Sequence, residues 1–461
     1  MMAWKARVSC LVCVLLTLAA SGGAVEVKAG AAKAVITPEL DSPLIGVMGK
    51  PLEGVNHDIY ARVLTLFDGE TRLVIVAYDL NCLDVATPIL REHCRDELGL
   101  DPACLILLGT HNHAAPIQIV PGNFQYGRRL AEVIFGAIRE AIAGEAGPAQ
   151  VRFGFGYGYF LTGMGNAPLD YEVQALEVRR NEAPFVLLFN HPTHPLQISE
   201  TRIDAGHAGF AVEELERRVP GLMAMYADAC GGNQFTRKGM FRPREDVEAL
   251  GRELADVAHA IMTGTMQDVT GPLRAALEVI PLPLEKPIPY EAAKKLASHF
   301  PTGIGFVPYP HAHRESNWVR SLLHHYEEGL PFPAKTTDMA CTDDGFLVHE
   351  LDEPRAFPCR YEETIVATIG PLVFVAMQGE VCAPIGMRIK DSFRCERPIM
   401  VFAYMGEHNL YIPTRELVRM QVYQAKVLQI QYACPVAWSP NVEDAMVTAV
   451  RSMIRKMTAG L

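Results

Sequence analysis

The chain has 461 residues, of which 49% are hydrophobic and 21% charged, and its 53 acidic and 42 basic residues give a formal net charge of −11. This composition is that of a globular protein and excludes a disordered tail, a collagen and a coiled coil. The acidic balance argues against nucleic acid as a partner, because a phosphate backbone selects basic surfaces.

The first 24 residues are expected to be a secretory signal peptide. Lys5 and Arg7 precede an apolar run from Val8 to Ala20, and small residues follow it. A basic start, a short apolar stretch and a small-residue exit are typical of such signals, and the run is short for a membrane span. We therefore expect a secreted or periplasmic protein without a transmembrane segment in its mature part. An uncleaved N-terminal anchor is the alternative.

Residues 25–461 are predicted to form one α/β domain with mixed β-sheets flanked by helices, because apolar runs of strand length alternate with helical patterns. Strands are expected at 72–78, 104–108, 151–155, 172–179, 185–189, 372–376 and 399–403. Helices are expected at 86–98, 130–142, 211–218, 245–262, 290–299, 314–328 and 442–457. A proline-rich passage at 281–289 indicates a seam, so two halves should meet near residues 265–290.

The two halves share a pattern. A strand, an acidic turn, a helix and a second strand precede residues 109–116, and the same succession precedes residues 406–413. Gly, His, Asn and Pro recur in the two loops, which makes His408 the counterpart of His111. Two β-α-β units related by a pseudo-twofold axis would deliver polar residues into one cleft. Chance similarity is the alternative.

Histidines follow two of the expected strands. His111 and His113 come after one, and His191 and His194 come after another. An i, i+2 pair leaving a strand presents both imidazoles on one side, and ligands in α/β folds gather beyond the carboxyl ends of strands. The pattern therefore predicts a site at the strand ends in which imidazoles could bind a metal. A structural role for the first pair is the alternative.

Glu380 has the same placement, directly after the strand expected at 372–376. Gly379 precedes it and permits close approach of the backbone. Glu380 therefore repeats the geometry of the histidines at a third strand end.

Several segments resemble, in order, motifs of the neutral/alkaline non-lysosomal ceramidase family. They are residues 30–38 and 54–58, Thr110-His-Asn-His-Ala-Ala-Pro116, Phe189-Asn-His-Pro-Thr193, the run from Gly379 to Arg388, and Tyr411-Ile-Pro-Thr-Arg-Glu416 followed by Tyr423. The family counterpart of residues 110–116 is Thr-His-Thr-His-Ser-Gly-Pro, and the counterpart of residues 189–193 is Phe-x-x-His-Pro. The resemblance spans residues 27 to 425, nearly the whole mature chain.

The family consists of zinc amidases, so the resemblance implies a zinc cofactor. The ligands that it implies are His111, His191, Glu380 and Tyr411. It also implies that His113 acts beside the metal as acid, base or hydrogen-bond donor, and that Tyr423 helps to hold the developing oxyanion. Residues expected to orient the ligands from behind are His194, Asn233 and His408.

The chain departs from the family in two places that bear on the substrate. Gly232-Asn-Gln-Phe235 stands where the family has Gly-Asp-Val-Ser, so a carboxylate and a hydroxyl are missing. Too few residues follow Tyr423 for the family's separate C-terminal β-sandwich. We therefore expect the metal site to be kept, and long-chain ceramide to be a poor substrate.

The sequence thus predicts a secreted zinc-dependent hydrolase that cleaves an amide bond in an N-acyl compound, with a small-molecule, lipid or glycan substrate. One alternative is a metal-dependent lyase or hydrolase that acts on a uronic-acid glycan. A second is a protein that binds a metal or ligand without catalysis, which the presence of Glu380 and Tyr411 disfavours. The oligomeric state is left open.

Overall fold

The computed structural model describes residues 26–459 except 42, 164–166, 301–314, 331–338, 343–344, 349–357 and 407–409. The expected signal peptide and His408 therefore lie outside the described residues. Within those ranges, no helix is both long enough and apolar enough to cross a bilayer.

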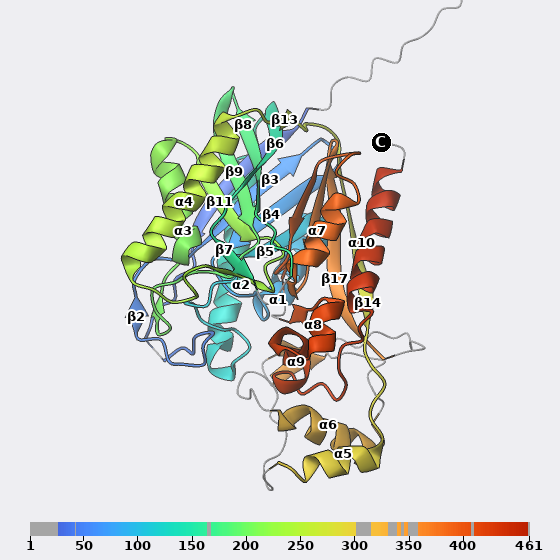
Figure 1. Cartoon of the computed structure of the whole chain (residues 1–461). Helices are drawn as coiled ribbons and strands as arrows, with labels where there is room; N and C mark the ends of the chain where they lie inside the picture. Colours follow the sequence, from blue (N-terminus) through green and yellow to red (C-terminus); the bar gives the residue numbers. More distant parts are fainter. Residues whose placement is uncertain are drawn as a thin grey trace, which may run out of the picture.

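The fold is built from three units of the same pattern, which follow one another along the chain (Figure 1). In each unit three strands pair antiparallel in chain order, with only short elements of other sheets or helices between them, then a helix crosses over and a fourth strand pairs parallel to the third. A further helix then covers the sheet. The parallel pairing needs the crossover helix, because parallel strands cannot be joined by a tight turn.

The bounds of the three units are as follows. The first comprises β1 (Lys28–Val35), β3 (Tyr60–Phe67), β4 (Arg72–Tyr78), α1 (Ala86–Leu98), β5 (Leu105–Gly109) and α2 (Phe124–Ala143). The second comprises β6 (Ala149–Tyr157), β8 (Glu172–Arg180), β9 (Ala183–His191), α3 (Gly206–Arg218), β11 (Met223–Asp228) and α4 (Arg244–Thr263), with β13 (Gln267–Asp268) at the β6 edge. The third comprises β14 (Leu273–Pro283), β17 (Cys359–Ile369), β18 (Leu372–Met377), α7 (Ala383–Asp391), β20 (Ile399–Phe402) and α10 (Val442–Thr458).

Shorter elements complete the described structure. The strands are β2 (Gly54–Val55), β7 (Leu161–Gly163), β10 (Arg202–Ile203), β12 (Gln234–Thr236), β15 (Met339–Thr342), β16 (Gly345–Val348), β19 (Glu380–Val381) and β21 (Tyr411–Ile412). The helices are α5 (Tyr290–Ala297), α6 (Ser316–Glu327), α8 (Arg415–Met420) and α9 (Tyr423–Ile430), with 3-10 turns at Pro102–Cys104 and Pro121–Asn123.

The inner faces of the three sheets share one hydrophobic core. Leu64 of the first sheet, Leu188 of the second and Phe374 of the third are fully buried in it. The outer faces are covered by α1 and α2, by α3 and α4, and by α7 and α10 respectively, and Figure 1 shows α3 and α4 on one flank and α10 on the other. Burial of both faces explains why the strands read as continuous apolar runs instead of alternating patterns.

The mixed α/β architecture with sheets flanked by helices is confirmed. The two predicted β-α-β units are present as β4-α1-β5 and β18-α7-β20, but β9-α3-β11 repeats them, so the repeat is threefold rather than twofold. The predicted proline-rich seam contains the end of β14, which carries Pro281 and Pro283. β14 is the edge strand of its sheet, where the missing N–H of proline is tolerated.

Candidate metal centre

The carboxyl ends of the third and fourth strands of each unit supply the residues of the site. A polar residue stands three positions beyond the third strand in every unit, and these residues are Asn81, His194 and Glu380. Two positions beyond the fourth strand stand His111, Cys230 and Tyr404. The threefold repeat therefore brings side chains that are far apart in sequence to one place.

Three of these residues converge into a buried group that could bind a metal ion. The candidate ligand atoms of His111, His194 and Glu380 all lie within 4.8 Å of one another. Glu380 Oε2 is 3.1 Å from Nε2 of His111 and 3.1 Å from Nε2 of His194. The Tyr411 hydroxyl lies 3.0 Å from His194 Nε2, because Glu380 and Tyr411 are directly paired in the parallel β19–β21 ladder.

The hydrogen bonds of His194 determine which of its nitrogens can bind a metal. Nδ1 faces two carbonyl oxygens, those of Gly231 at 3.0 Å and Gln234 at 3.2 Å. Carbonyl oxygens only accept, so Nδ1 carries the hydrogen, and in the neutral ring Nε2 keeps its lone pair. That lone pair faces the Tyr411 hydroxyl at 3.0 Å and the Glu380 carboxylate at 3.1 Å, and a cation between the two acceptors would offset their repulsion.

Unpartnered polar atoms point to the same conclusion. Glu380 Oε2 and His111 Nε2 are buried, and neither makes a hydrogen bond, although they are only 3.1 Å apart. Buried polar atoms are rarely left unsatisfied. A carboxylate oxygen and two imidazole nitrogens suit zinc, so the donor set fits the metal.

Charges at the site also favour metal ligation. Burial alone would raise the pKa of Glu380, but His111 and His194 outweigh it and hold the pKa at about 2, so the carboxylate is charged. Burial lowers the pKa of His111 despite the opposing effect of Glu380. A neutral imidazole and a charged carboxylate are the forms in which these groups bind a metal.

The loop that carries His111 and His113 is anchored by the residue between them. The Asn112 side chain donates to the backbone carbonyls of Asp79 at 2.9 Å and Asp204 at 2.8 Å, and it accepts from the amide of Ala114. This holds the two imidazoles together, with ring centroids 4.5 Å apart. Burial lowers the pKa of His113 well below its usual value, and the neighbouring His111 and His194 lower it further.

Two residues that support His111 were not singled out from the sequence. The side-chain amide of Asn81 lies 3.0 Å from His111 Nδ1, and Tyr404 stacks on the imidazole with 4.3 Å between ring centroids. His111 and Tyr404 both have positive φ angles, 53° and 55°. Such strain in non-glycine residues persists where surrounding structure fixes it, and it is common at functional sites.

Glycines allow the loop after β11 to pack against Glu380. A Cβ at Gly232 would collide with the Glu380 carbonyl oxygen, and the Gly232 amide donates to Val381 at 3.0 Å. Asn233, expected behind the ligands, accepts a 2.8 Å hydrogen bond from the amide of Ala383. Gly379 has a φ of 82°, which fits its expected close approach. The loop thus connects the second unit to the third beside the site.

The buried group contains His194 where the motif predicts His191. β9 continues through His191, which is paired with Asp228 of β11, and the chain leaves the sheet only at Pro192. The His191 ring packs against Phe160, at 4.5 Å between centroids, and burial lowers its pKa to about 3. His194 lies two residues beyond Pro192, outside the strand, and its side chain therefore reaches Glu380.

Of the two tyrosines predicted for the site, Tyr411 is buried with its hydroxyl at His194, and Tyr423 lies at the edge of the group. The Tyr411 and Tyr423 rings are 5.8 Å apart, and Tyr423 is 43% exposed. Burial raises the pKa of the Tyr423 hydroxyl to about 12, with a smaller contribution from Glu380. Phe235 packs on His194 with 4.6 Å between centroids, so the residue that replaces the family serine borders the group. His408 falls outside the described residues.

The fold is shared with neutral ceramidases of known structure. The structure of neutral ceramidase from Pseudomonas aeruginosa superposes with a TM-score of 0.66 and 16% sequence identity, over 92% of this chain and 73% of that one. A ceramidase complexed with C2 gives the same TM-score and identity, over 93% of this chain and 76% of that one. No protein-family model matches the chain, and no curated protein is similar to it in sequence. The resemblance predicted from motifs is therefore confirmed at the level of the fold.

Proposed function

We propose that the protein is a zinc-dependent hydrolase that cleaves an amide bond in an N-acyl compound. His111, His194 and Glu380 would hold the metal, with Tyr411 as the neighbouring fourth candidate. The observation that carries the proposal is the convergence of two imidazole nitrogens on Glu380 Oε2, which lies 3.1 Å from Nε2 of both His111 and His194 and makes no hydrogen bond of its own. The fold shared with neutral ceramidase supports the reaction class.

Amide hydrolysis requires an activated water, stabilisation of the oxyanion and a proton for the departing amine. A bound zinc ion supplies Lewis acidity and lowers the pKa of water towards about 7. His113 lies beside the group, and its Nδ1 has no partner among the described residues. Burial keeps the His113 ring neutral, which is the form with a free lone pair, so it would accept a proton from the attacking water and pass it to the leaving nitrogen.

Tyr423 would serve the oxyanion. Burial raises the pKa of its hydroxyl to about 12, so the hydroxyl stays protonated at neutral pH. A protonated phenol can donate a hydrogen bond to an oxygen that becomes negative in the transition state. The exposed position of Tyr423 places this donor on the solvent side of the group.

The substrate should differ from long-chain ceramide. Phe235 presents an apolar ring next to His194 where the ceramidase motif has a serine. Sites built to hydrogen-bond a hydroxyl discriminate strongly, whereas apolar walls discriminate by about 1–3 kcal/mol per methylene. We therefore expect a smaller or more polar N-acyl compound to be preferred. The signal-like residues 1–24 support export, which N-terminal sequencing of the exported protein would test.

The test is turnover by zinc-depleted and zinc-reconstituted protein on a panel of short N-acyl amides, long-chain ceramide in mixed micelles and a uronic-acid oligosaccharide. We expect zinc-dependent release of a free amine, fastest from the short amides. A kcat/KM on ceramide of about 10⁴ M⁻¹s⁻¹ or above would contradict the expected preference. An unsaturated, ultraviolet-absorbing product from the oligosaccharide would identify a lyase, and bound zinc without turnover of any amide would contradict the proposal.

A further inference from the structure

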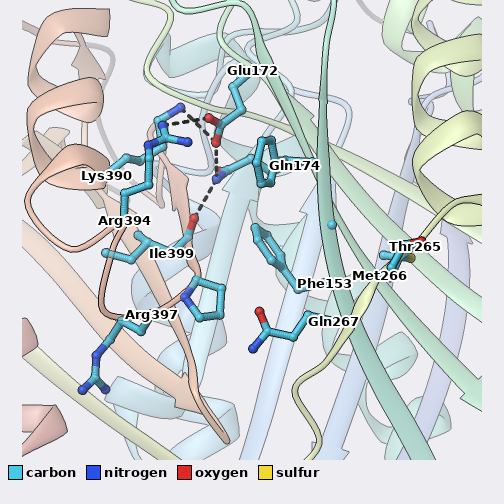
Figure 2. Close-up of a pocket in the computed structure, with 13 residues that line it drawn as sticks. Phe153, Glu172, Gln174, Thr265, Met266, Gln267, Lys390, Arg394, Arg397 and Ile399 are labelled. Carbon is cyan, nitrogen blue, oxygen red and sulfur yellow. Dashed lines mark hydrogen bonds and ion pairs between the residues drawn. The ribbon is translucent and has the colours of Figure 1, made fainter.

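A cavity at the junction of the second and third units is separate from the metal centre. It has a volume of about 530 Å³, within the range of roughly 300–1,000 Å³ that small-molecule sites occupy. Its walls come from β6 and β8, from the segment leading into β13, and from the end of α7 and the turn before β20 (Figure 2). None of the described lining residues belongs to the metal group.

The charges at one end of this cavity are already paired. Glu172 accepts from Gln174 at 2.8 Å and from Arg394 at 2.9 Å, and Lys390 lies 3.4 Å away. Lys390 is in turn paired with Asp170 at 2.7 Å. Figure 2 shows Lys390, Arg394 and Gln174 gathered around Glu172, and together with Asp170 they form the Glu172 cluster. Its two carboxylates and two cations neutralise one another.

The remaining charged side chain of the wall, Arg397, does not face the interior of the cavity. Figure 2 shows its guanidinium turned away from Phe153 and Gln267. A ligand in the cavity would therefore meet no unpaired charge. Because taking an ion out of water is costly unless an opposite charge receives it, the cavity suits an uncharged ligand.

A row of aromatic side chains leads out of the cavity along one face of β6. Alternate residues of a strand share a face, and here they are Phe153, Phe155 and Tyr157, followed by Tyr159. Phe153 is buried, whereas Phe155, Tyr157 and Tyr159 are 49%, 51% and 68% exposed. The ring centroids of Phe155 and Tyr157 are 6.1 Å apart, and those of Tyr157 and Tyr159 are 6.3 Å apart. Apolar groups exposed together in this way mark binding surfaces.

The aromatic row has a rigid backing. Gly154 and Gly156 alternate with it on the other face of β6, and a Cβ at either position would lie 2.9 or 3.1 Å from the Ile261 side chain of α4. The helix therefore packs directly on the strand. β13 pairs with β6 only at Arg152 and Phe153, so no described strand covers the outer edge of β6 beyond that point. The row is thus exposed and held in place by regular structure.

Uncharged hydrogen-bonding groups accompany the aromatic row. Gln267 and Thr265 line the cavity, and neither side chain makes a hydrogen bond to a described residue. The Tyr157 and Tyr159 hydroxyls also make none within the described ranges. A carboxamide and a hydroxyl can each donate and accept. The surface therefore combines aromatic faces with free polar groups that carry no charge.

We propose that the cavity and the aromatic row bind a neutral oligosaccharide. A sugar ring has C–H groups on its faces and hydroxyls on its rim. The C–H groups are attracted to the negative face of an aromatic ring, and the hydroxyls pair with Gln267, Thr265 and the two phenols. A ligand without charge matches a site without unpaired charge, and the straight course of β6 suits an extended chain of sugars. The binding is reversible and independent of the metal centre and of the reaction proposed for it.

The test is isothermal titration calorimetry of the full chain with cellohexaose, xylohexaose, mannohexaose and N-acetylchitohexaose. We expect wild-type protein to bind at least one of them. Tyr157→Ala and Tyr159→Ala should each lower that affinity by about tenfold, which corresponds to about 1.4 kcal/mol, whereas Tyr157→Phe and Tyr159→Phe should retain most of it because they keep the ring. Tyr290→Ala is the matched control, since α5 lies at the opposite end of the molecule from β6 (Figure 1).

A second comparison separates this site from the metal centre. The neutral hexasaccharide should bind His194→Ala as tightly as wild type, and hexagalacturonate, a charged counterpart, should bind His194→Ala much more weakly. The proposal is wrong if none of the neutral hexasaccharides binds, if Tyr157→Ala and Tyr159→Ala both bind like wild type, or if His194→Ala abolishes binding. Binding to phosphatidylcholine vesicles that Tyr159→Ala abolishes, without any saccharide binding, would instead identify the row as a lipid contact. Circular dichroism would show that each variant is folded.

Discussion

The metal centre and the Glu172 cluster both place a buried carboxylate at a junction between units, yet the two carboxylates have opposite surroundings. Glu172 receives hydrogen bonds or ion pairs from an amide, a guanidinium and an ammonium. Glu380 faces two imidazole nitrogens, one of them without a hydrogen to give, and its Oε2 makes no hydrogen bond. A carboxylate whose partners are already in the protein stabilises the fold, whereas one that lacks them is available to a ligand.

The largest expected effect concerns His113 at the metal centre. His113→Ala should keep most of the metal and lose turnover by about 10²–10⁴-fold, the usual contribution of a positioned acid or base. Steady-state kinetics combined with metal analysis would measure both. Loss of the metal along with activity would show that His113 is a ligand rather than a proton carrier.

Substitutions in the cluster of charged residues around Glu172 should change the stability of the protein rather than its activity. Lys390→Met would leave the buried Asp170 and Glu172 without their shared partner, and breaking a buried pair costs about 3–5 kcal/mol. Arg394→Gln is the matched control, because its side chain is 44% exposed and exposed pairs contribute about 0–1 kcal/mol. Urea unfolding would measure both, and similar losses would contradict the distinction between the two carboxylates.

A buried histidine in the second unit should make the protein sensitive to acid. Burial lowers the pKa of His207 to about 4, and its Nδ1 accepts from the amide of Leu196 at 3.1 Å. Below pH 6.5 the unfolded chain binds a proton that the folded chain refuses, so stability falls as the pH drops from 6.5 to about 4. The loss from this residue should reach about 3 kcal/mol.

His207→Asn tests this assignment, since the asparagine oxygen can still accept from Leu196 but does not titrate. The free energy of unfolding of the variant should decline less between pH 7 and pH 4.5 than that of wild type. Parallel pH profiles for the two proteins would show that His207 does not cause the acid sensitivity. The other buried histidines contribute to both profiles, so the difference between the two profiles reports His207.

Strong apolar patterns made much of the fold predictable. The strand at 72–78 and the helix at 86–98 have the predicted bounds, because no glycine interrupts their periodicity and the proline of the helix, Pro88, lies in its first turn, where proline is tolerated. β14 could not be predicted from the sequence because prolines argue against a strand. They are permitted here because β14 lies at the edge of its sheet. β1 has four alanines among its eight residues and only one of the β-branched residues that mark a strand, Val35.

The site was predictable in its motifs but less so in its ligands. Sequence alone cannot show that β9 runs through His191, so it does not distinguish His191 from His194. The threefold repeat supplies the missing signal. Once the strand ends are known, Asn81, His194 and Glu380 stand at equivalent positions of the three units. Tyr404 was missed because its role is to stack on His111, a contact between distant segments that no local pattern records.

The central claim is that the three units place His111, His194 and Glu380 around one metal ion. Its most direct test is the zinc content of purified wild type, His194→Ala and His191→Ala, measured by inductively coupled plasma mass spectrometry after dialysis against zinc. We predict stoichiometric zinc in wild type and His191→Ala, and loss of zinc from His194→Ala. Zinc retained by His194→Ala and lost from His191→Ala would contradict the account.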